Sequence, residues 1–446
     1  MVSGPRRAGR YAHPPDRIRC MTTIRLAAVA TALYLLVTGT ATVAQRGGAE
    51  HWVGTWATAP VARPQAAPGA GQGRGAAPLN FNNQTLRQVV HISVGGSRVR
   101  VILSNVFGTS PLTVGGAGVA VRQKDSAIVG GSARPLTFGG NAATTVAAGA
   151  VAVSDPVNLA VAALSDLAVD LFLPGDTAAS TSPLTTHNGA LQTNYVSTAG
   201  NHVGVAEFPV SAPTQSWFFL SAVDVTAPPQ VGTVVALGDS ITDGTLSTPD
   251  TNNRWPDHLA RRLMAGGTSP SRPMGVLNQG IAGNRVLVDF VGPSALARFD
   301  RDVLAQSGVT HVILLEGLND LGLGGGNGQP IPSAADVIAG YKQILARAHS
   351  HGIKVIAGTM TPFEGTNLGA IAPDYYSSEK NSRRQAINEF VRSGGGSDGV
   401  IDFEAAVRDP GHPLQLLARF KGADNLHLTD AGYQAMAQAV NLTLLR

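Results

Sequence analysis

The chain has 446 residues, 43% of them hydrophobic and 14% charged, with a formal net charge of +4. This length exceeds what one compact core usually holds, so it predicts two domains after any leader is removed. Outside the N-terminal region, no apolar run is long enough to cross a bilayer, and no block of Lys and Arg marks a nucleic-acid surface. A membrane span and nucleic-acid binding are therefore excluded.

The N-terminal region resembles a secretory leader. Arg25 precedes an apolar stretch over 26–37, and the small residues 42–44 follow it, which is typical of a signal peptide with its cleavage site. Residues 1–20 are expected to be an upstream extension. Cleavage after residue 44 changes the formal charge from +4 to −1. The protein is therefore expected to be secreted, to the extracellular space or the periplasm.

The only cysteine, Cys20, lies in this leader region. The mature chain would then hold no disulfide and no thiol nucleophile. Export normally permits disulfides, but a chain of this length buries enough apolar surface to fold without them.

Residues 45–228 are predicted to form a β-sandwich-like or jelly-roll-like accessory domain. Residues 98–101 and 167–171 alternate apolar and polar side chains as half-buried strands do, and Gly- and Pro-rich turns separate such runs. The stretch 62–78, rich in Ala, Gly, Pro and Gln, is predicted to be a loop. Pro228-Pro229 marks the expected boundary, because proline cannot donate to a β-ladder.

Residues 229–446 switch to alternating strands and helices, which predicts a three-layer α/β/α domain with a flavodoxin-like parallel sheet. The predicted strands are 233–237, 276–277, 311–315, 354–358 and 400–401. The predicted helices are 255–264, 295–304, 334–350, 380–391 and 431–444.

Polar residues follow the first three of these strands. Ser240 comes after the first, Gly283 lies in the segment after the second, and Asn319 follows the third. Because parallel strands end at one edge of a sheet, these residues are expected to meet in one crevice. Asp424 and His427 precede the last helix. Ser240, Gly283, Asn319, Asp424 and His427 together supply a hydroxyl, a base, a carboxylate and hydrogen-bond donors.

These residues resemble the SGNH (GDSL) hydrolase superfamily, whose sequence blocks are matched in order across the catalytic half. The matching blocks are Gly238-Asp239-Ser240, Gly283, Gly317-x-Asn319-Asp320 and Asp424-x-x-His427. The β-rich half and the segment 51–56 further resemble a secreted bacterial subgroup with an N-terminal β domain, similar to arylesterases and acylhydrolases.

The resemblance implies a serine esterase. The sequence has no zinc or calcium ligand spacing, so catalysis is expected to need neither a metal nor a cofactor. Ser240 would be the nucleophile, His427 its general base, and Asp424 the group that orients the imidazole. A backbone carbonyl is the alternative orienting group. The oxyanion hole would consist of the backbone N–H groups of Ser240 and Gly283 and the side-chain amide of Asn319.

Asp239 and Asp320 are expected to brace loops by accepting backbone N–H bonds. The pattern Gly395-x-Ser397-x-Gly399 is not a nucleophile elbow, because it lies between a helix and a strand rather than between a strand and a helix. This serine is therefore interpreted as a loop residue.

The expected substrates are short acyl, above all acetyl, esters of polysaccharides or small alcohols. The alternatives are a lipase, lysophospholipase or thioesterase and, from another class, a non-catalytic carbohydrate-binding or cell-wall protein. The β domain would either bind carbohydrate or wall the active site. The sequence does not predict the oligomeric state.

Overall fold

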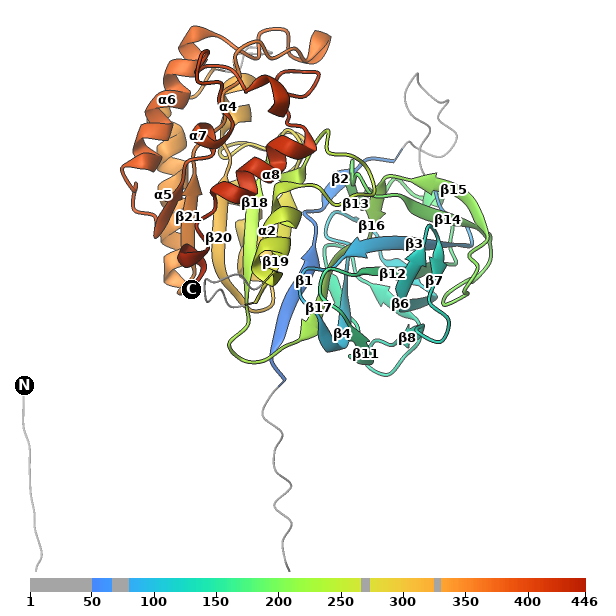
Figure 1. Ribbon diagram of the computed structural model, residues 1–446. Helices are drawn as coiled ribbons and strands as arrows, with labels where there is room; N and C mark the ends of the chain where they lie inside the picture. Colours follow the sequence, from blue (N-terminus) through green and yellow to red (C-terminus); the bar gives the residue numbers. More distant parts are fainter. Residues whose placement is uncertain (1–49, 66–79, 266–272, 325–329) are drawn as a thin grey trace, which may run out of the picture. The chain divides into compact units, whose positions relative to one another are not determined.

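The computed structural model describes residues 50–65, 80–265, 273–324 and 330–446 (Figure 1). The predicted leader, residues 1–44, lies outside these ranges. Residues 50–446 form one compact unit. None of the helices in the described ranges is long and apolar enough to span a membrane.

The β half, residues 50–228, is built mainly from two antiparallel sheets that share one buried apolar cluster. One sheet has the order β1 (Trp52–Ala57), β17 (Leu220–Thr226), β4 (Gly96–Ser104) and β10 (Val151–Val153), with β11 (Val157–Val161) also on β4. The other has the order β15 (Val210–Thr214), β14 (Asn194–Ala199), β3 (Gln84–His91), β12 (Asp166–Leu173), β6 (Gly116–Lys124) and β7 (Ala127–Ile128), with β8 (Arg134–Leu136) on β6.

Smaller elements complete the β half. They are the sheet β16 (Ser216–Phe218), β13 (Leu184–Asn188) and β2 (Val61–Arg63), the pair β5 (Leu112–Val114) and β9 (Thr144–Val146), and the 3₁₀ turn η1 (Thr177–Ala179). The predicted loop over 62–78 is wrong at its start, because residues 62 and 63 pair with β13. Residues 66–78 lie outside the described ranges.

The predicted alternation holds in β4, where Val99 and Val101 are buried and their neighbours are partly exposed. In β12 the expectation of a half-buried strand is wrong. This strand lies between β3 and β6, and both of its faces are covered. Its polar residue Asp170 can be buried without a large free-energy cost, because its carboxylate accepts two hydrogen bonds from Arg87, at 2.8 and 2.7 Å.

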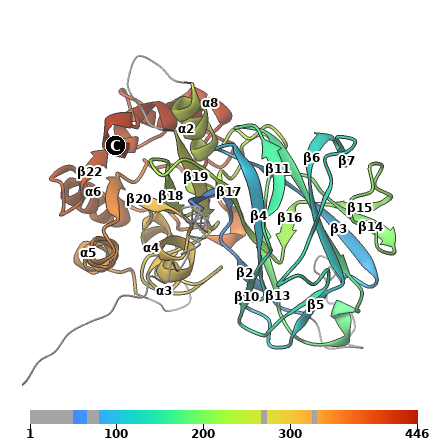
Figure 2. The same ribbon diagram turned by 90° about the horizontal axis from the view of Figure 1, so that it is seen from below.

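The α/β half, residues 229–446, contains the predicted parallel sheet. Its order is β19 (Met274–Gly280), β18 (Gly232–Gly238), β20 (Val309–Leu315), β21 (Lys354–Gly358) and β22 (Gly399–Ile401), with every pair parallel. All five strands contain the residues predicted from the sequence. In Figure 2, α2 (Trp255–Met264) and α8 (Asp430–Ala439) lie on one side of β18 and β19, whereas α3 (Ala295–Phe299), α4 (Leu318–Gly322) and α5 (Ala334–Ser350) lie on the other.

The remaining helical elements are α1 (Ser240–Asp243), η2 (Asp300–Leu304), η4 (Gly369–Ile371), α6 (Ser378–Arg392), α7 (Phe403–Val407), η5 (Ala418–Phe420) and η6 (Leu442–Leu445). Two predicted helices are interrupted. The helix over 295–304 changes to a π-helical turn at Asp300. The last helix ends at Ala439, because Val440 and Asn441 are extended and Asn441 caps a new 3₁₀ turn.

The two halves are hydrogen-bonded and closely packed. The Gly54 N–H in β1 donates to the Ser307 carbonyl at 2.9 Å, and the Ser93 hydroxyl accepts from Val276 N–H in β19 at 2.9 Å. A Cβ at Gly275 would lie 2.0 Å from the Gly54 carbonyl oxygen, so only glycine permits this approach. The β half therefore packs against β19, one of the two edge strands of the parallel sheet, and supports it.

Candidate active site

Ser240 lies where β18 ends and α1 begins, at the carboxyl edge of the parallel sheet. Asp239 caps the short helix, since its Oδ1 accepts the Ile241 N–H at 2.9 Å. A side chain at Gly238 would meet the Leu315 carbonyl oxygen at 2.4 Å. The turn is therefore tightly packed and presents the Ser240 hydroxyl in a fixed position.

His427 and Asp424 lie together beside Ser240. His427 Nε2 is 2.7 Å from Ser240 Oγ, and His427 Nδ1 is 2.6 Å from Asp424 Oδ2. The other carboxylate oxygen accepts the backbone N–H groups of Leu426 and His427, at 3.0 and 2.9 Å. A carboxylate, rather than the alternative backbone carbonyl, thus faces the imidazole.

Burial opposes ionisation of Asp424, but hydrogen bonds and the nearby charge of His427 lower the pKa of this carboxyl group to about 2. Asp424 is therefore ionised over the ordinary range of pH. An ionised acceptor at Nδ1 keeps a proton on that nitrogen and leaves Nε2 free to accept the serine proton.

Asn319 lies in the first turn of α4, after Gly317, whose φ of +104° suits glycine. Its amide oxygen accepts the Tyr375 hydroxyl at 2.8 Å, and its Nδ2 lies 3.4 Å from Asp239 Oδ2. Because the oxygen is held by Tyr375, the N–H₂ group is directed towards the Asp239–Ser240 turn. Such an amide can donate to an oxyanion there.

Gly283 follows β19 and has a φ of +79°. Its segment is tied to the nucleophile turn, because Ile281 N–H donates to the Gly238 carbonyl at 3.1 Å. A Cβ at Gly283 would lie 2.7 Å from Val291 Cγ2, so the chain after Gly283 returns over it. The structure thus places all five predicted site residues along one edge of the sheet.

Asp239 and Asp320 both accept backbone N–H bonds, as expected. Asp320 binds the N–H groups of Val286 and Leu287, at 2.7 and 3.0 Å, and so fixes the segment that follows Gly283. Burial raises the pKa of both carboxyl groups to about 6. These two residues hold the loops that surround the Ser240 hydroxyl.

Sequence reasoning missed Arg298 beneath the site. This buried guanidinium donates to Asn284 Oδ1 at 2.9 Å, to the Gln279 carbonyl at 2.6 Å and to the Gly238 carbonyl at 2.9 Å. It therefore ties the ends of β18 and β19 to the Gly283 segment. The i,i+4 spacing of Arg298 and Asp302 is compatible with an ion pair on one helix face, but no sequence pattern predicts that Arg298 binds the carbonyls of the loops.

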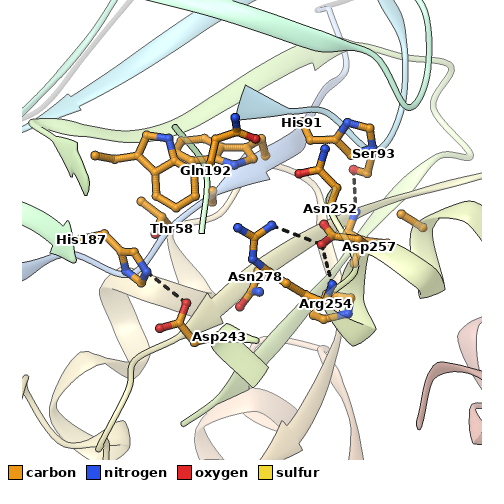
Figure 3. Close-up of a pocket in the computed structure, with 16 residues that line it drawn as sticks. Thr58, His91, Ser93, His187, Gln192, Asp243, Asn252, Arg254, Asp257 and Asn278 are labelled. Carbon is orange, nitrogen blue, oxygen red and sulfur yellow. Dashed lines mark hydrogen bonds and ion pairs between the residues drawn. The ribbon is translucent and has the colours of Figure 1, made fainter. Parts of the chain in front are cut away.

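A second polar cluster lies at the junction of the two halves, around a cavity of about 40 Å³ (Figure 3). His187 Nδ1 is 2.8 Å from the Ala59 carbonyl, and Nε2 is 3.1 Å from Asp243 Oδ1. Both partners are acceptors, so the ring needs both protons. Burial lowers the pKa of His187, but the Asp243 carboxylate outweighs it and raises the pKa overall, although Arg254 opposes this.

The His187–Asp243 pair joins β13 to α1, the helix that begins with Ser240. Sequence reasoning missed it, since 56 residues separate the partners. In the described ranges, no group of three His, Cys, Asp or Glu side chains is arranged to hold a metal ion.

Residues 236–435 match the GDSL-like Lipase/Acylhydrolase family. The α/β half carries a GDSL-like lipase/acylhydrolase domain. Because of this family match, the protein is a serine ester hydrolase, and the substrates of such an enzyme are esters. A search of curated proteins finds no match.

Similar solved structures that are named as esterases or acylhydrolases align with slightly less than half of this chain. The aryl esterase of M. smegmatis is 15% identical over 47% of this chain and 95% of its own, with a TM-score of 0.37. The lipase/acylhydrolase of Enterococcus faecalis is 21% identical over 48% and 94%, with a TM-score of 0.35. The acetyl xylan esterase AlAXEase is 19% identical over 46% and 96%, with a TM-score of 0.34.

Proposed function

We propose that this protein is a secreted carboxylic ester hydrolase in which Ser240 forms an acyl-enzyme. The observation that carries the proposal is the continuous chain of contacts from Ser240 Oγ through His427 to Asp424, at 2.7 and 2.6 Å. A serine hydroxyl is a weak nucleophile until an adjacent base accepts its proton.

In the proposed mechanism, His427 Nε2 takes the Ser240 proton as Oγ attacks the ester carbonyl. The tetrahedral oxyanion is stabilised by the N–H groups of Ser240 and Gly283 and by Asn319 Nδ2. His427 then protonates the leaving alcohol. In the second half-reaction it activates water, which releases the acid and restores the serine, while Asp424 stabilises the imidazolium.

We propose short acyl esters of polysaccharides or small alcohols as the substrates. The segment 248–253 supports a polar alcohol group, because it is tied to Asp430, three residues after His427. Thr248 N–H and Asn253 Nδ2 both donate to Asp430, at 2.8 and 2.9 Å, and residues 248–251 are exposed. A lipase, lysophospholipase or thioesterase remains the alternative within enzymes. Acetylated xylan, a lysophospholipid and an acyl thioester, assayed side by side, distinguish these classes.

A fluorophosphonate probe tests the catalytic assignment against a non-catalytic carbohydrate-binding or cell-wall role. We expect covalent labelling of the wild-type protein and none of Ser240→Ala. Ser397→Ala is the matched control, because Ser397 donates to the Gly394 and Gly399 carbonyls in a loop distant in sequence from the blocks. Folded wild-type protein that neither reacts with the probe nor hydrolyses any ester would refute the proposal.

We further propose the organisation that the sequence predicts: a leader over 1–44, a β-sandwich-like domain over 45–228 and a catalytic α/β/α domain over 229–446. The change from antiparallel to parallel pairing between β17 and β18 supports the second boundary. The helices on both sides of β18 and β19 support the layering (Figure 2). N-terminal sequencing of protein recovered from the culture medium tests cleavage after residue 44.

A further inference from the structure

A groove of about 910 Å³ lies beside the candidate active site. Its walls come from the segment after Gly283, from the end of α4 together with Ile331, and, as the third wall, from η4 through the first turn of α6. Its lining includes Arg285, Val288, Phe290, Gly322, Ile371 and Lys380. This volume lies at the upper end of the range usual for ligand-binding pockets, roughly 300–1,000 Å³.

Each wall is connected to a proposed oxyanion donor. Arg285 is two residues beyond Gly283. Gly322 lies in the same short helix as Asn319. Tyr375 is buried behind the third wall. Its hydroxyl donates to Asn319 Oδ1 at 2.8 Å, and its ring packs on Gly322. The groove is therefore built from the same segments as the groups proposed to bind the substrate carbonyl oxygen.

The chemistry decides which part of the ester faces this groove. His427 protonates the leaving oxygen, so the alcohol must lie towards His427. The acyl chain then extends to the opposite side of the carbonyl carbon. None of the residues described as lining the groove comes from the segment that carries Asp424 and His427. The groove consequently lies on the acyl side.

The groove lining exposes large apolar side chains. Val288 is 52% exposed, Phe290 60% and Ile371 87%. Single exposed apolar residues are common, but three around one groove mark a binding surface. The Arg285 guanidinium lies 4.6 Å from the centroid of the Phe290 ring and supports it from one side.

The buried cation of the third wall is already engaged. Lys380 Nζ donates to the carbonyls of Gly322 and Asp374, at 2.8 and 2.5 Å. It therefore closes the wall by joining two segments. Lys380 gives no reason to expect an anionic ligand, and the exposed apolar side chains of the lining match an acyl chain.

We propose that this groove binds the acyl group of the substrate and selects apolar chains longer than acetyl. The proposal rests on the ester hydrolase function above and departs from the acetyl preference expected from the sequence, because an acetyl group reaches little of the groove. Each methylene that leaves water should raise kcat/KM about four-fold until the groove is filled.

A series of p-nitrophenyl esters tests this, because the alcohol stays constant while the acyl group grows from acetate to butyrate, hexanoate and octanoate. For wild-type protein we expect kcat/KM to rise by at least ten-fold from acetate to its maximum. Val288→Asp should lower the hexanoate-to-acetate ratio by about ten-fold or more, because a carboxylate replaces apolar lining. Val210→Asp is the matched control: Val210 lies in β15, is 42% exposed, and should leave the ratio unchanged.

The outcomes separate this proposal from the function on which it rests. If acetate is the best ester and Val288→Asp leaves the ratio unchanged, the acyl groove is refuted and the ester hydrolase stands. If folded protein hydrolyses none of the esters, acetate included, both proposals fall. A rising series that Val288→Asp flattens and Val210→Asp preserves supports the groove.

Discussion

Tyr375 offers a sharp test of how the oxyanion donor is oriented. Its hydroxyl donates to Asn319 Oδ1 at 2.8 Å from a fully buried position, and burial raises the pKa of the phenol well above 10, so the donor is always protonated. Tyr375→Phe keeps the ring that packs on Gly322 and Phe363 and removes only the hydroxyl. We expect it to act through Asn319 as a positioning residue.

The magnitude follows from the two contacts of the Asn319 amide. Without the hydroxyl, a buried oxygen loses its donor, which costs about 1–3 kcal/mol in stability. The amide then loses its preference for directing Nδ2 at the substrate, because its remaining contact, with Asp239, is long at 3.4 Å. Removing an oxyanion donor outright typically lowers kcat by about 10²–10³. Tyr375→Phe should therefore lower kcat by about ten-fold, and never by more than Asn319→Ala does.

The assay is a double-mutant cycle on kcat and KM, with thermal unfolding to confirm that each variant folds. We expect Tyr375→Phe combined with Asn319→Ala to have the kcat of Asn319→Ala alone, and KM to change little. Tyr376→Phe is the control, since its hydroxyl binds Glu364 at 3.1 Å and not the site. Additive losses in kcat, or a loss in Tyr376→Phe as large as in Tyr375→Phe, would refute the reasoning.

Two further predictions concern charged pairs. Asp424→Asn should lower kcat by about 10⁴. The amide would offer His427 Nδ1 either a donor or a weak acceptor, so it would no longer hold the imidazole in the tautomer that leaves Nε2 free to accept the serine proton. Because the pKa of Asp424 is depressed to about 2, its stabilisation should be present above pH 3.8 and lost on acidification towards pH 2, and urea unfolding of the wild type and the variant should converge there. His187, whose pKa is raised above 6.5, should contribute fully below pH 6.5 and lose its effect as pH rises through the folded-state pKa. His187→Gln should cost about 3–5 kcal/mol at about pH 6, because it removes the cation that faces the buried Asp243 carboxylate; equal urea midpoints of the variant and the wild type there would contradict the pair.

The order and type of the elements in the α/β half were predictable because their signals are local. The helices over 255–264 and 334–350 have the predicted bounds, since apolar periodicity and capping residues such as Ser333 act within a few turns. The nucleophile turn was likewise local, because Gly238, Asp239 and Ser240 form it from three consecutive residues. Where competing caps end a helix early, as after Ala439, periodicity alone extended it too far.

The sequence by itself determined which residue types follow the parallel strands and precede the last helix, and hence the candidates Ser240, Asn319 and His427. Only the tertiary structure decided what holds them in place. Tyr375 lies 56 residues from Asn319, and Arg298 lies 60 residues from the Gly238 carbonyl that it binds. Such pairs follow no helical or strand period, because strand order and loop packing bring them together, and no local pattern encodes that proximity.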